Sequence, residues 1–336
     1  MTSITEFDIG TECHYSQQGM TLSGWVFVTG ASSGLGEATA LEFARGGARV
    51  IAGFRRLTDG DALKKKAPGI VCVQIDLADP ASILRAGGEV DRISGPEGLS
   101  ALVNAAGYAI YGPIEHTAGE DVQRLFQVLT FGPAQLTNAL RPSLARRLTA
   151  SGPRAKIFNV ISWSWMDAAP FVGYYAAAKS ALLRLTEAQM YELDRFGIDA
   201  TAIVPGLMRT SFLARAGTQV SDALARLSPE GLRDYGEPLR KLAEMSKGAP
   251  KNPLAVTPEK VARRIVSLAR RNRLGPQYNI GIDTAIVAAM KPLLPFCFIR
   301  RIKVAMFGLD ELPAVVAADF HLPRNEIVQK VNHHAR

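Results

Sequence analysis

A glycine-rich turn between a strand pattern and a helix pattern constrains this chain more than any other feature. The turn, residues 29–36 (TGASSGLG), follows the apolar run 25–28 and opens a helical pattern that continues to residue 46. Glycine lets the backbone turn tightly and approach a ligand without an intervening side chain. The helix that follows points free N–H groups and the positive end of its dipole at the turn, which suits a diphosphate. We therefore predict cofactor binding by Thr29, Gly30, Ser32, Ser33, Gly34, Leu35 and Gly36.

Short apolar runs alternate with helical patterns along most of the chain. Runs rich in Val and Ile are typical of parallel strands that helices cover on both faces. The predicted strands are 25–29, 49–54, 71–75, 101–104, 156–161, 199–204 and 277–280, and the predicted helices include 34–46, 119–150 and 175–196. Right-handed crossovers between such strands give a doubly wound, mostly parallel α/β sheet of the Rossmann type. Ligands bind beyond the carboxyl ends of the strands in these sheets, which is where the motifs below fall.

The 336 residues, 47% of them hydrophobic, suffice for one large α/β domain with additions. We expect a flexible leader at 1–22, a single catalytic domain at 23–282 with a helical lid at 207–257, and an apolar and basic extension at 283–336. The three cysteines are isolated and form no CxxC pair. This argues against a disulfide framework or a metal site and fits a reducing, cytoplasmic compartment.

The formal net charge is +8, and basic residues cluster at 64–66, 263–273 and 300–303. Solvated helix faces, an anionic cofactor or an anionic membrane surface each explain this charge, while nucleic acid ranks last because no recognition module accompanies it. The apolar run 282–299 is interrupted by charges and prolines, so we do not expect it to span a membrane. The segment 283–309 would cap or pack against the domain, or else lie on a membrane surface.

A tyrosine and a lysine four residues apart, Tyr175 and Lys179, stand at the start of a predicted helix and share one of its faces. A phenol is a poor acid or base at neutral pH, and a nearby ammonium is expected to lower its pKa. Ser162, at the end of the fifth predicted strand, can reach the same carbonyl oxygen as the tyrosine. These three side chains predict a proton-transfer site for interconversion of an alcohol and a carbonyl compound.

Together these motifs resemble the short-chain dehydrogenase/reductase family over about residues 25–270. The resemblance rests on Thr29–Gly36, Asp76 after the third strand, Asn104 to Gly107 after the fourth, Ser162, Tyr175, Lys179, and Pro205-Gly206 followed by Thr210. The segment 196–199 leading into 204–206 resembles the branch that acts on steroids, retinoids and other lipophilic alcohols. Relatives are commonly homo-oligomers, so the resemblance also implies an oligomer.

The resemblance implies a role for each matching residue. Tyr175 would donate or accept the proton, Lys179 would hydrogen-bond the nicotinamide ribose and lower the tyrosine pKa, and Ser162 would orient the substrate oxygen. The remaining cofactor contacts implied are Asp76 and Leu77 at the adenine, Asn104, Ala105 and Gly107 near the adenosine ribose, and Pro205, Gly206 and Thr210 at the carboxamide.

The end of the second predicted strand bears on the choice of cofactor. An NAD-preferring site places a carboxylate here to accept from the ribose 2′-hydroxyl. Phe54 occupies that position instead, and Arg55 and Arg56 follow, whose planar, permanently charged groups suit a 2′-phosphate. We predict NADP(H), with NAD(H) as the alternative if both arginines are only surface residues. Ser33 stands where many NADP-binding relatives carry a basic residue.

Leu129 is a departure from the family pattern, since it falls where an asparagine usually helps to hold a proton-relaying water. Leucine can neither donate nor accept a hydrogen bond. Thr130 would compensate if the helix shifted by one residue. Otherwise the relay uses other waters, the enzyme is slow, or the chemistry is not simple redox.

The predicted substrate pocket is apolar and roomy. Its candidate residues are Tyr108, Trp163, Ser164, Trp165, Phe171, Met208 and Phe212. These residues and the long lid favour an NADP(H)-dependent oxidoreductase that interconverts a ketone and a secondary alcohol on a bulky, lipophilic small molecule. Two alternatives remain open: a redox-neutral isomerisation, dehydration or cyclisation on the same fold, and a non-catalytic cofactor-binding protein.

Overall fold

Seven parallel strands form the centre of the molecule. The computed structural model describes residues 24–150, 153–209, 216–248, 252 and 255–309. Within them the strand order is β3-β2-β1-β4-β5-β6-β7, and every neighbouring pair is parallel. The strands are β1 Trp25–Thr29, β2 Arg49–Phe54, β3 Val71–Gln74, β4 Leu99–Asn104, β5 Ala155–Val160, β6 Ile198–Pro205 and β7 Gln277–Ile280.

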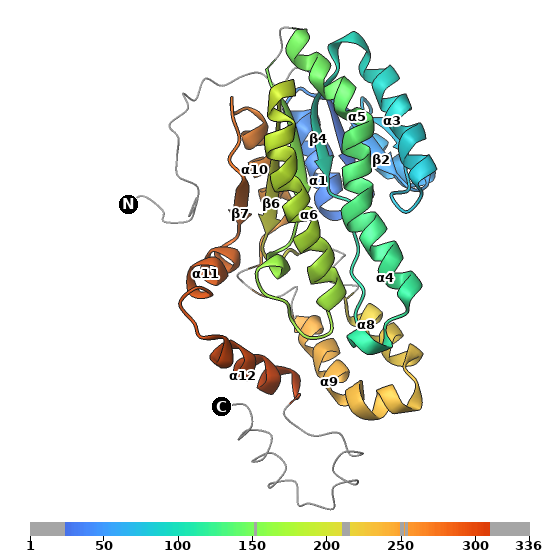
Figure 1. Cartoon of the computed structure of the whole chain (residues 1–336). Coiled ribbons are helices and arrows are strands. Elements are labelled where there is room, and N and C mark those ends of the chain that lie inside the picture. Colours follow the sequence, from blue (N-terminus) through green and yellow to red (C-terminus); the bar gives the residue numbers. More distant parts are fainter. Residues whose placement is uncertain (1–23, 151–152, 210–215, 249–251, 253–254, 310–336) are drawn as a thin grey trace, which may run out of the picture.

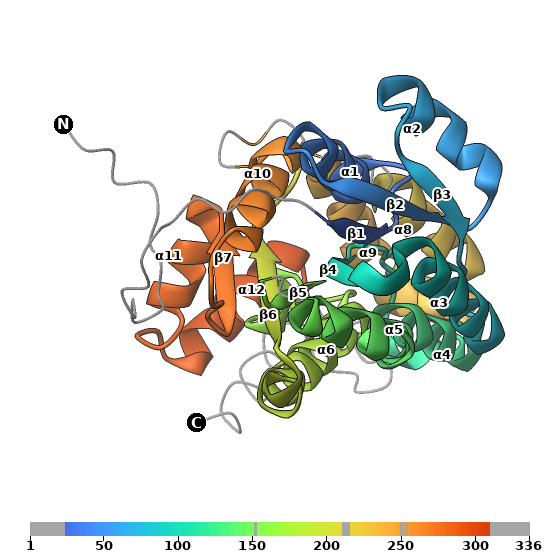
Figure 2. The same cartoon turned by 90° about the horizontal axis from the view of Figure 1, so that it is seen from above.

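Helices cover both faces of this sheet (Figure 2). One face carries α1 (Gly34–Arg45) and α10 (Pro258–Ala269), which pack against each other. The other carries α3 (Pro80–Ser94), α5 (Gly132–Thr149) and α6 (Gly173–Glu192), with α4 (Gly119–Phe126) preceding α5. The short α2 (Asp61–Lys66) lies near β3. The predicted doubly wound α/β fold is therefore confirmed.

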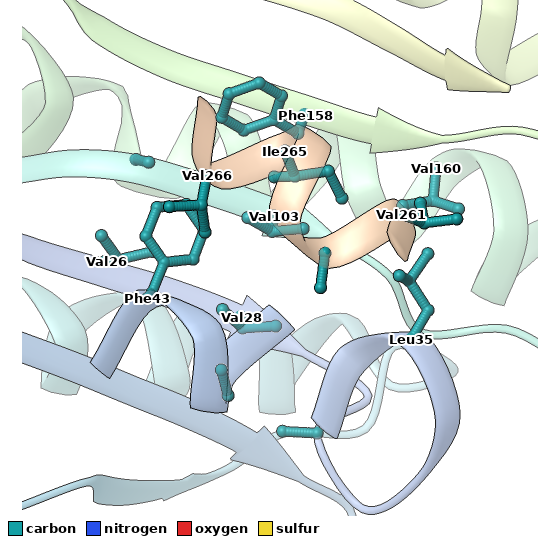
Figure 3. Close-up of a cluster of buried hydrophobic side chains, with 14 of the residues drawn as sticks. Val26, Val28, Leu35, Phe43, Val103, Phe158, Val160, Val261, Ile265 and Val266 are labelled. Carbon is teal, nitrogen blue, oxygen red and sulfur yellow. The ribbon is translucent and has the colours of Figure 1, made fainter. Parts of the chain in front are cut away.

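Successive side chains of each strand point to opposite faces of the sheet, so each face has its own apolar core. On β1, Val26 and Val28 face the α1 and α10 side, whereas Phe27 faces the α3 and α5 side. Figure 3 shows the first core, in which Phe43 of α1 lies beside Val266 of α10. Full burial on both faces explains why the strand segments are almost continuously apolar.

The strand order reverses at β1, which pairs with β2 on one side and with β4 on the other. Chain connections leave the sheet in opposite directions from this point and open a crevice at the carboxyl ends of the strands. The glycine-rich turn follows β1, and the segment 104–107 follows β4. Both motifs therefore lie at this crevice.

Additional helices gather at one end of the sheet, at the bottom of Figure 1. The predicted lid contains α8 (Ala216–Arg226) and α9 (Pro229–Gly248), and a parallel bridge between Met208 and Val256 joins its two ends. After β7 come α11 (Ile282–Met290) and α12 (Phe296–Phe307). Among the described residues, no helix is long and apolar enough to cross a membrane.

Candidate functional site

Close packing leaves no room for a side chain at two positions of the glycine-rich turn, Gly30 and Gly36. Gly30 has φ +69°, and a Cβ built on it would lie 2.6 Å from the Ala106 Cα. A Cβ on Gly36 would lie 2.2 Å from the Gly30 carbonyl oxygen. The turns after β1 and β4 are thus in contact, which explains why glycine is required at both positions.

Thr29 locks these two turns together. Its hydroxyl accepts hydrogen bonds from the backbone N–H groups of Ala105 and Ala106, both at 3.2 Å, and donates to the Val103 carbonyl at 3.4 Å. The side chain is fully buried. We had predicted Thr29 as a cofactor ligand, and in the structure its side chain positions the crevice.

The start of α1 is open to an anion. Ser33 precedes the helix in an extended conformation, and its side chain makes no capping hydrogen bond. The first N–H groups of a helix have no partner within the helix, and the dipole adds positive potential at this end. The glycine cradle and the uncapped helix start therefore fit the diphosphate of a dinucleotide.

The two arginines after β2 differ in their partners. Arg56 donates to Asp59 through Nη2 at 2.9 Å and through Nε at 3.3 Å, so its planar group is already engaged. Arg55 accepts a hydrogen bond from Gln74 through its backbone carbonyl. The exposed Arg55 side chain forms no ion pair with any residue that the structure describes. Of the two, Arg55 has its charged group available for a ligand.

The predicted adenine contacts form the turn after β3. The Asp76 carboxylate accepts from the Ala78 N–H at 2.9 Å and lies 3.9 Å from the Arg124 guanidinium. Leu77 is buried, and its carbonyl accepts from Gln127 at 3.2 Å. Asp76 thus shapes the turn with one carboxylate oxygen and remains partly exposed beside the crevice.

Asn104 connects the crevice to the helix that carries the tyrosine. Its amide donates to Asn159 on β5 at 2.7 Å, and Asn159 donates to Thr186 on α6 at 2.9 Å. Asn104 is buried, and its Oδ1 has no hydrogen-bond partner among the described residues. The sequence analysis did not find Asn159, because an asparagine inside an apolar strand carries no motif.

Ser162, Tyr175 and Lys179 come together at the end of β5. The Ser162 hydroxyl is hydrogen-bonded to the Tyr175 phenol and also accepts from the Ser164 N–H at 3.3 Å. The Lys179 ammonium donates to the Val160 carbonyl at 2.6 Å. Because Val160 ends β5 two residues before Ser162, this bond fixes the helix face with both reactive residues against the strand end.

The pKa of Tyr175 moves in the direction opposite to the one expected. Burial raises it to about 12, and the hydrogen bond from Ser162 opposes this only in part. Burial also lowers the pKa of Lys179 from 10.5 to about 8. The structure contradicts the prediction that the lysine lowers this pKa, because loss of hydration on burial dominates and Lys179 is not among the groups that shift it.

Leu129 lies in a π-helical turn, Gln127–Phe131, that joins α4 to α5. The leucine is fully buried and packs with Leu125 and Ala178. A Cβ built on Gly107 would lie 2.9 Å from the Leu129 Cδ2 and 3.9 Å from the Lys179 Nζ, so the leucine covers the region of the ammonium with apolar surface.

Thr130, offered as a compensating residue, is engaged elsewhere. Its hydroxyl donates to the Ala178 carbonyl at 2.9 Å. This bond anchors the π-helical turn to α6 at Ala178, the residue before Lys179. The position at which the sequence resemblance implies an asparagine thus lies in a π-helical turn and carries an apolar side chain.

The residues predicted for the substrate pocket fall into different surroundings. Trp163 and Trp165 pack against the apolar cluster between α6 and the strands. Met208 packs against the core on the α1 face, and Tyr108 against the Leu125 and Leu129 cluster. Ser164 is buried, and its hydroxyl has no partner among the described residues. Thr210 and Phe212 lie outside the described residues.

Phe171 packs against α8 and α9. It has φ +66°, a conformation that is uncommon for a residue with a side chain, and its carbonyl accepts from the Gly112 N–H at 2.9 Å. Its ring packs with Val220 of α8 and Leu239 of α9. Tyr111 packs against the same cluster and lies close enough to Tyr175 to raise the pKa of that residue.

Asp283, which the sequence analysis treated only as an interruption of an apolar run, supports the Pro205-Gly206 turn. Its carboxylate accepts from the Leu207 N–H at 2.6 Å. A Cβ built on Gly206 would lie 2.0 Å from the Asp283 Oδ1, which explains the glycine. The sequence signal that could have indicated this role is a single acidic residue within an apolar stretch.

The comparisons with known proteins agree with this geometry. A family model described as short chain dehydrogenase matches residues 24–221. The chain belongs to the short-chain dehydrogenase family. It is therefore an NAD(P)-dependent oxidoreductase.

Two relatives and one solved structure illustrate what this short-chain dehydrogenase is similar to. The NADPH-dependent 3-dehydrocapnine reductase of Ornithobacterium rhinotracheale is 30% identical over 193 residues, which cover 57% of this chain and 68% of the relative. Human retinol dehydrogenase 5 is 31% identical, with 63% of this chain and 66% of the relative covered. A solved short-chain dehydrogenase from Streptomyces avermitilis is 25% identical, with a TM-score of 0.62, and 81% of this chain and 97% of that one are covered.

Proposed function

We propose that this short-chain dehydrogenase uses NADP(H) to interconvert a ketone and a secondary alcohol on a bulky, lipophilic small molecule. The observation that carries the proposal is the hydrogen bond between Ser162 and Tyr175, with Lys179 fixed one helical turn away. An intact set of this kind favours catalysis over a purely cofactor-binding role.

Tyr175 acts as the proton donor when the carbonyl is reduced. Its pKa of about 12 keeps the phenol protonated at neutral pH, so the proton is held until a substrate oxygen accepts it. Ser162, already bonded to the phenol, donates to the same oxygen and orients it. The bound dihydronicotinamide would supply the hydride that adds to the carbonyl carbon.

Lys179 restores the charge balance after this transfer. Once the proton has left, the positive lysine stabilises the phenolate, and reprotonation completes the cycle. Because burial lowers its pKa to about 8, Lys179 can also release a proton near neutral pH. In the opposite direction the same groups remove the alcohol proton, so the residues support either direction.

The preference for NADP(H) rests on Arg55. The end of β2 carries no carboxylate to accept from a ribose 2′-hydroxyl, since buried Phe54 occupies that position. Arg55 keeps its planar cation available, which suits a 2′-phosphate. The NADPH-dependent name of one relative supports the same choice.

The lipophilic substrate class rests on the lid. Phe171 and Tyr111 join Val220 and Leu239 in an apolar cluster, and Tyr111 is near the Tyr175 phenol. Retinol dehydrogenase 5, a relative named for a lipophilic alcohol, supports this class. Apolar walls with few polar groups favour binding of a bulky apolar molecule.

Replacing Tyr175 with Phe tests the proposal. We expect the Tyr175→Phe variant to bind NADPH as the unaltered protein does and to lose about 10²- to 10⁴-fold in turnover. Tyr174→Phe is the matched control, since the neighbouring phenol bonds only to the Ile114 carbonyl at 3.3 Å among the interactions described. The assay follows NADPH consumption with a panel of hydrophobic aryl and ring ketones. Full activity in Tyr175→Phe, or tight NADPH binding with no turnover in the unaltered protein across the panel, would contradict the mechanism.

A further inference from the structure

The two C-terminal helices expose rows of large apolar side chains. Of the 17 such side chains that are exposed among the described residues, eight lie between 282 and 306. On α11 the row is Ile282, Ile286 and Met290, and on α12 it is Phe298, Ile302 and Met306. Residues spaced by four lie on one face of a helix, so each helix presents a continuous apolar strip to solvent.

Leu293, between the two helices, and Phe296, at the start of α12, add to the exposed apolar side chains of this segment. Leu293 and Phe296 are each 79% exposed, the highest values among the large apolar side chains that the structure describes. The concentration of exposed apolar side chains on these two consecutive helices indicates an interaction site rather than an ordinary monomer surface.

The charge around the strips is positive. Lys291, Arg300 and Arg301 are exposed and form no ion pair within the described part of the chain. The one acidic residue between 282 and 309 is Asp283, whose carboxylate is turned inward to the Leu207 N–H. The surface therefore combines apolar strips with uncompensated cations, which complements an anionic lipid surface.

An adjacent side of α12 is fastened to the domain. Lys303 donates to the Ala168 carbonyl at 2.6 Å and pairs with Asp167 at 2.6 Å. Phe307 packs edge-on against Phe171 with ring centres 6.3 Å apart. These contacts hold α12 beside α9 (Figure 1), and the apolar strip lies about 100° around the helix from them.

We infer that the outer face of α11 and α12 binds the surface of an anionic lipid bilayer. The helices lie in the interfacial region without crossing it, because neither is long enough to span. Apolar side chains enter the headgroup boundary while the three cations meet lipid phosphates and carboxylates. This inference does not depend on the reaction at Tyr175.

Sedimentation of the full-length protein with vesicles tests the inference. One vesicle preparation contains phosphatidylcholine alone, and the other also contains phosphatidylserine. We expect binding to the second that weakens as salt concentration rises. Arg300→Glu with Arg301→Glu should weaken it by at least about 30-fold, since each basic residue near such a surface contributes about 1 kcal/mol.

Apolar variants complete the test. Phe298→Ser with Ile302→Ser should lose binding, whereas Leu84→Ser, at a 67% exposed leucine on α3, should retain it. NADPH binding by every variant checks that the domain is folded. Absence of binding to both vesicle types would overturn the inference. The inference would also be overturned if the unaltered protein were an oligomer that does not bind vesicles and the double variant Phe298→Ser with Ile302→Ser were a monomer. The face would then be a subunit interface.

Discussion

The buried Lys179 should make the stability of the cofactor-free protein depend on pH in a defined window. Its pKa is about 8 in the folded protein and 10.5 ordinarily. Below pH 8 both folded and unfolded chains carry the charge, so the cost of burying it is fully present. Between about 8 and 10.5 the folded chain has lost a proton that the unfolded chain still holds, so stability rises with pH across this window.

The size of the effect follows from the two pKa values. The difference between about 8 and 10.5 corresponds to about 3 kcal/mol of unfolding free energy. Replacing Lys179 with Met removes the charge, so its unfolding free energy should lack this dependence. The unfolding free energy of Lys179→Met minus that of the unaltered protein should therefore fall by about 2 to 3 kcal/mol between pH 7 and pH 10.

Urea unfolding of both proteins across that pH range provides the measurement. Comparing the two cancels every other group that titrates in both, Tyr175 excepted, whose pKa of about 12 places its loss of a proton above the range. Lys65→Met, at an exposed lysine, is the control and should differ from the unaltered protein by the same amount at every pH. A difference for Lys179→Met that does not change with pH would refute the argument that burial controls this ammonium.

Three further changes test other parts of the structure. Arg55→Ala should weaken NADPH binding about tenfold or more and leave NADH binding unchanged, whereas Arg56→Ala, at an arginine already paired with Asp59, should have a smaller effect in the same fluorescence titration. Gly30→Ala should abolish NADPH binding and lower the melting temperature, because the new Cβ would lie 2.6 Å from the backbone of the neighbouring turn. Gly47→Ala is the control: with φ +88° and open space around it, this change adds backbone strain alone and should lower the unfolding free energy by only about 1 kcal/mol. Asp199→Ala should destabilise the fold by about 3 to 5 kcal/mol in urea unfolding, since it removes the partner of the buried Lys156 at 2.6 Å; equal stability would contradict this.

The sequence predicted the sheet closely because each strand is buried on both faces. β1, β2 and β7 have the predicted bounds, and the other strands differ by one or two residues at one or both ends. The missed helix α3 (Pro80–Ser94) had a recognisable start, because Asp79 caps the Ala81 N–H and proline occupies the first helical position. Its sparse apolar residues gave too weak a periodic pattern beside that signal.

The site was predictable where a motif carries the geometry. Ser162 is hydrogen-bonded to Tyr175, and Lys179 is bonded to the end of β5 at Val160, because helical spacing and a strand end fix their positions. The pKa direction at Tyr175 was not predictable, since it depends on burial by residues distant in sequence. The support of the Pro205-Gly206 turn by Asp283 was equally hidden, because about 80 residues separate the two along the chain and only tertiary packing joins them.

The reversal of strand order at β1 divides the carboxyl-end edge of the sheet into two separate regions. Arg55 and the turn after β3 belong to one, while Ser162, Tyr175 and the lid belong to the other. Substitutions that are far apart and share no partners combine additively in free energy. Evolution can therefore exchange the preferred nucleotide on one side and the preferred alcohol on the other in separate steps, so a single scaffold can acquire new pairings of the two without being rebuilt.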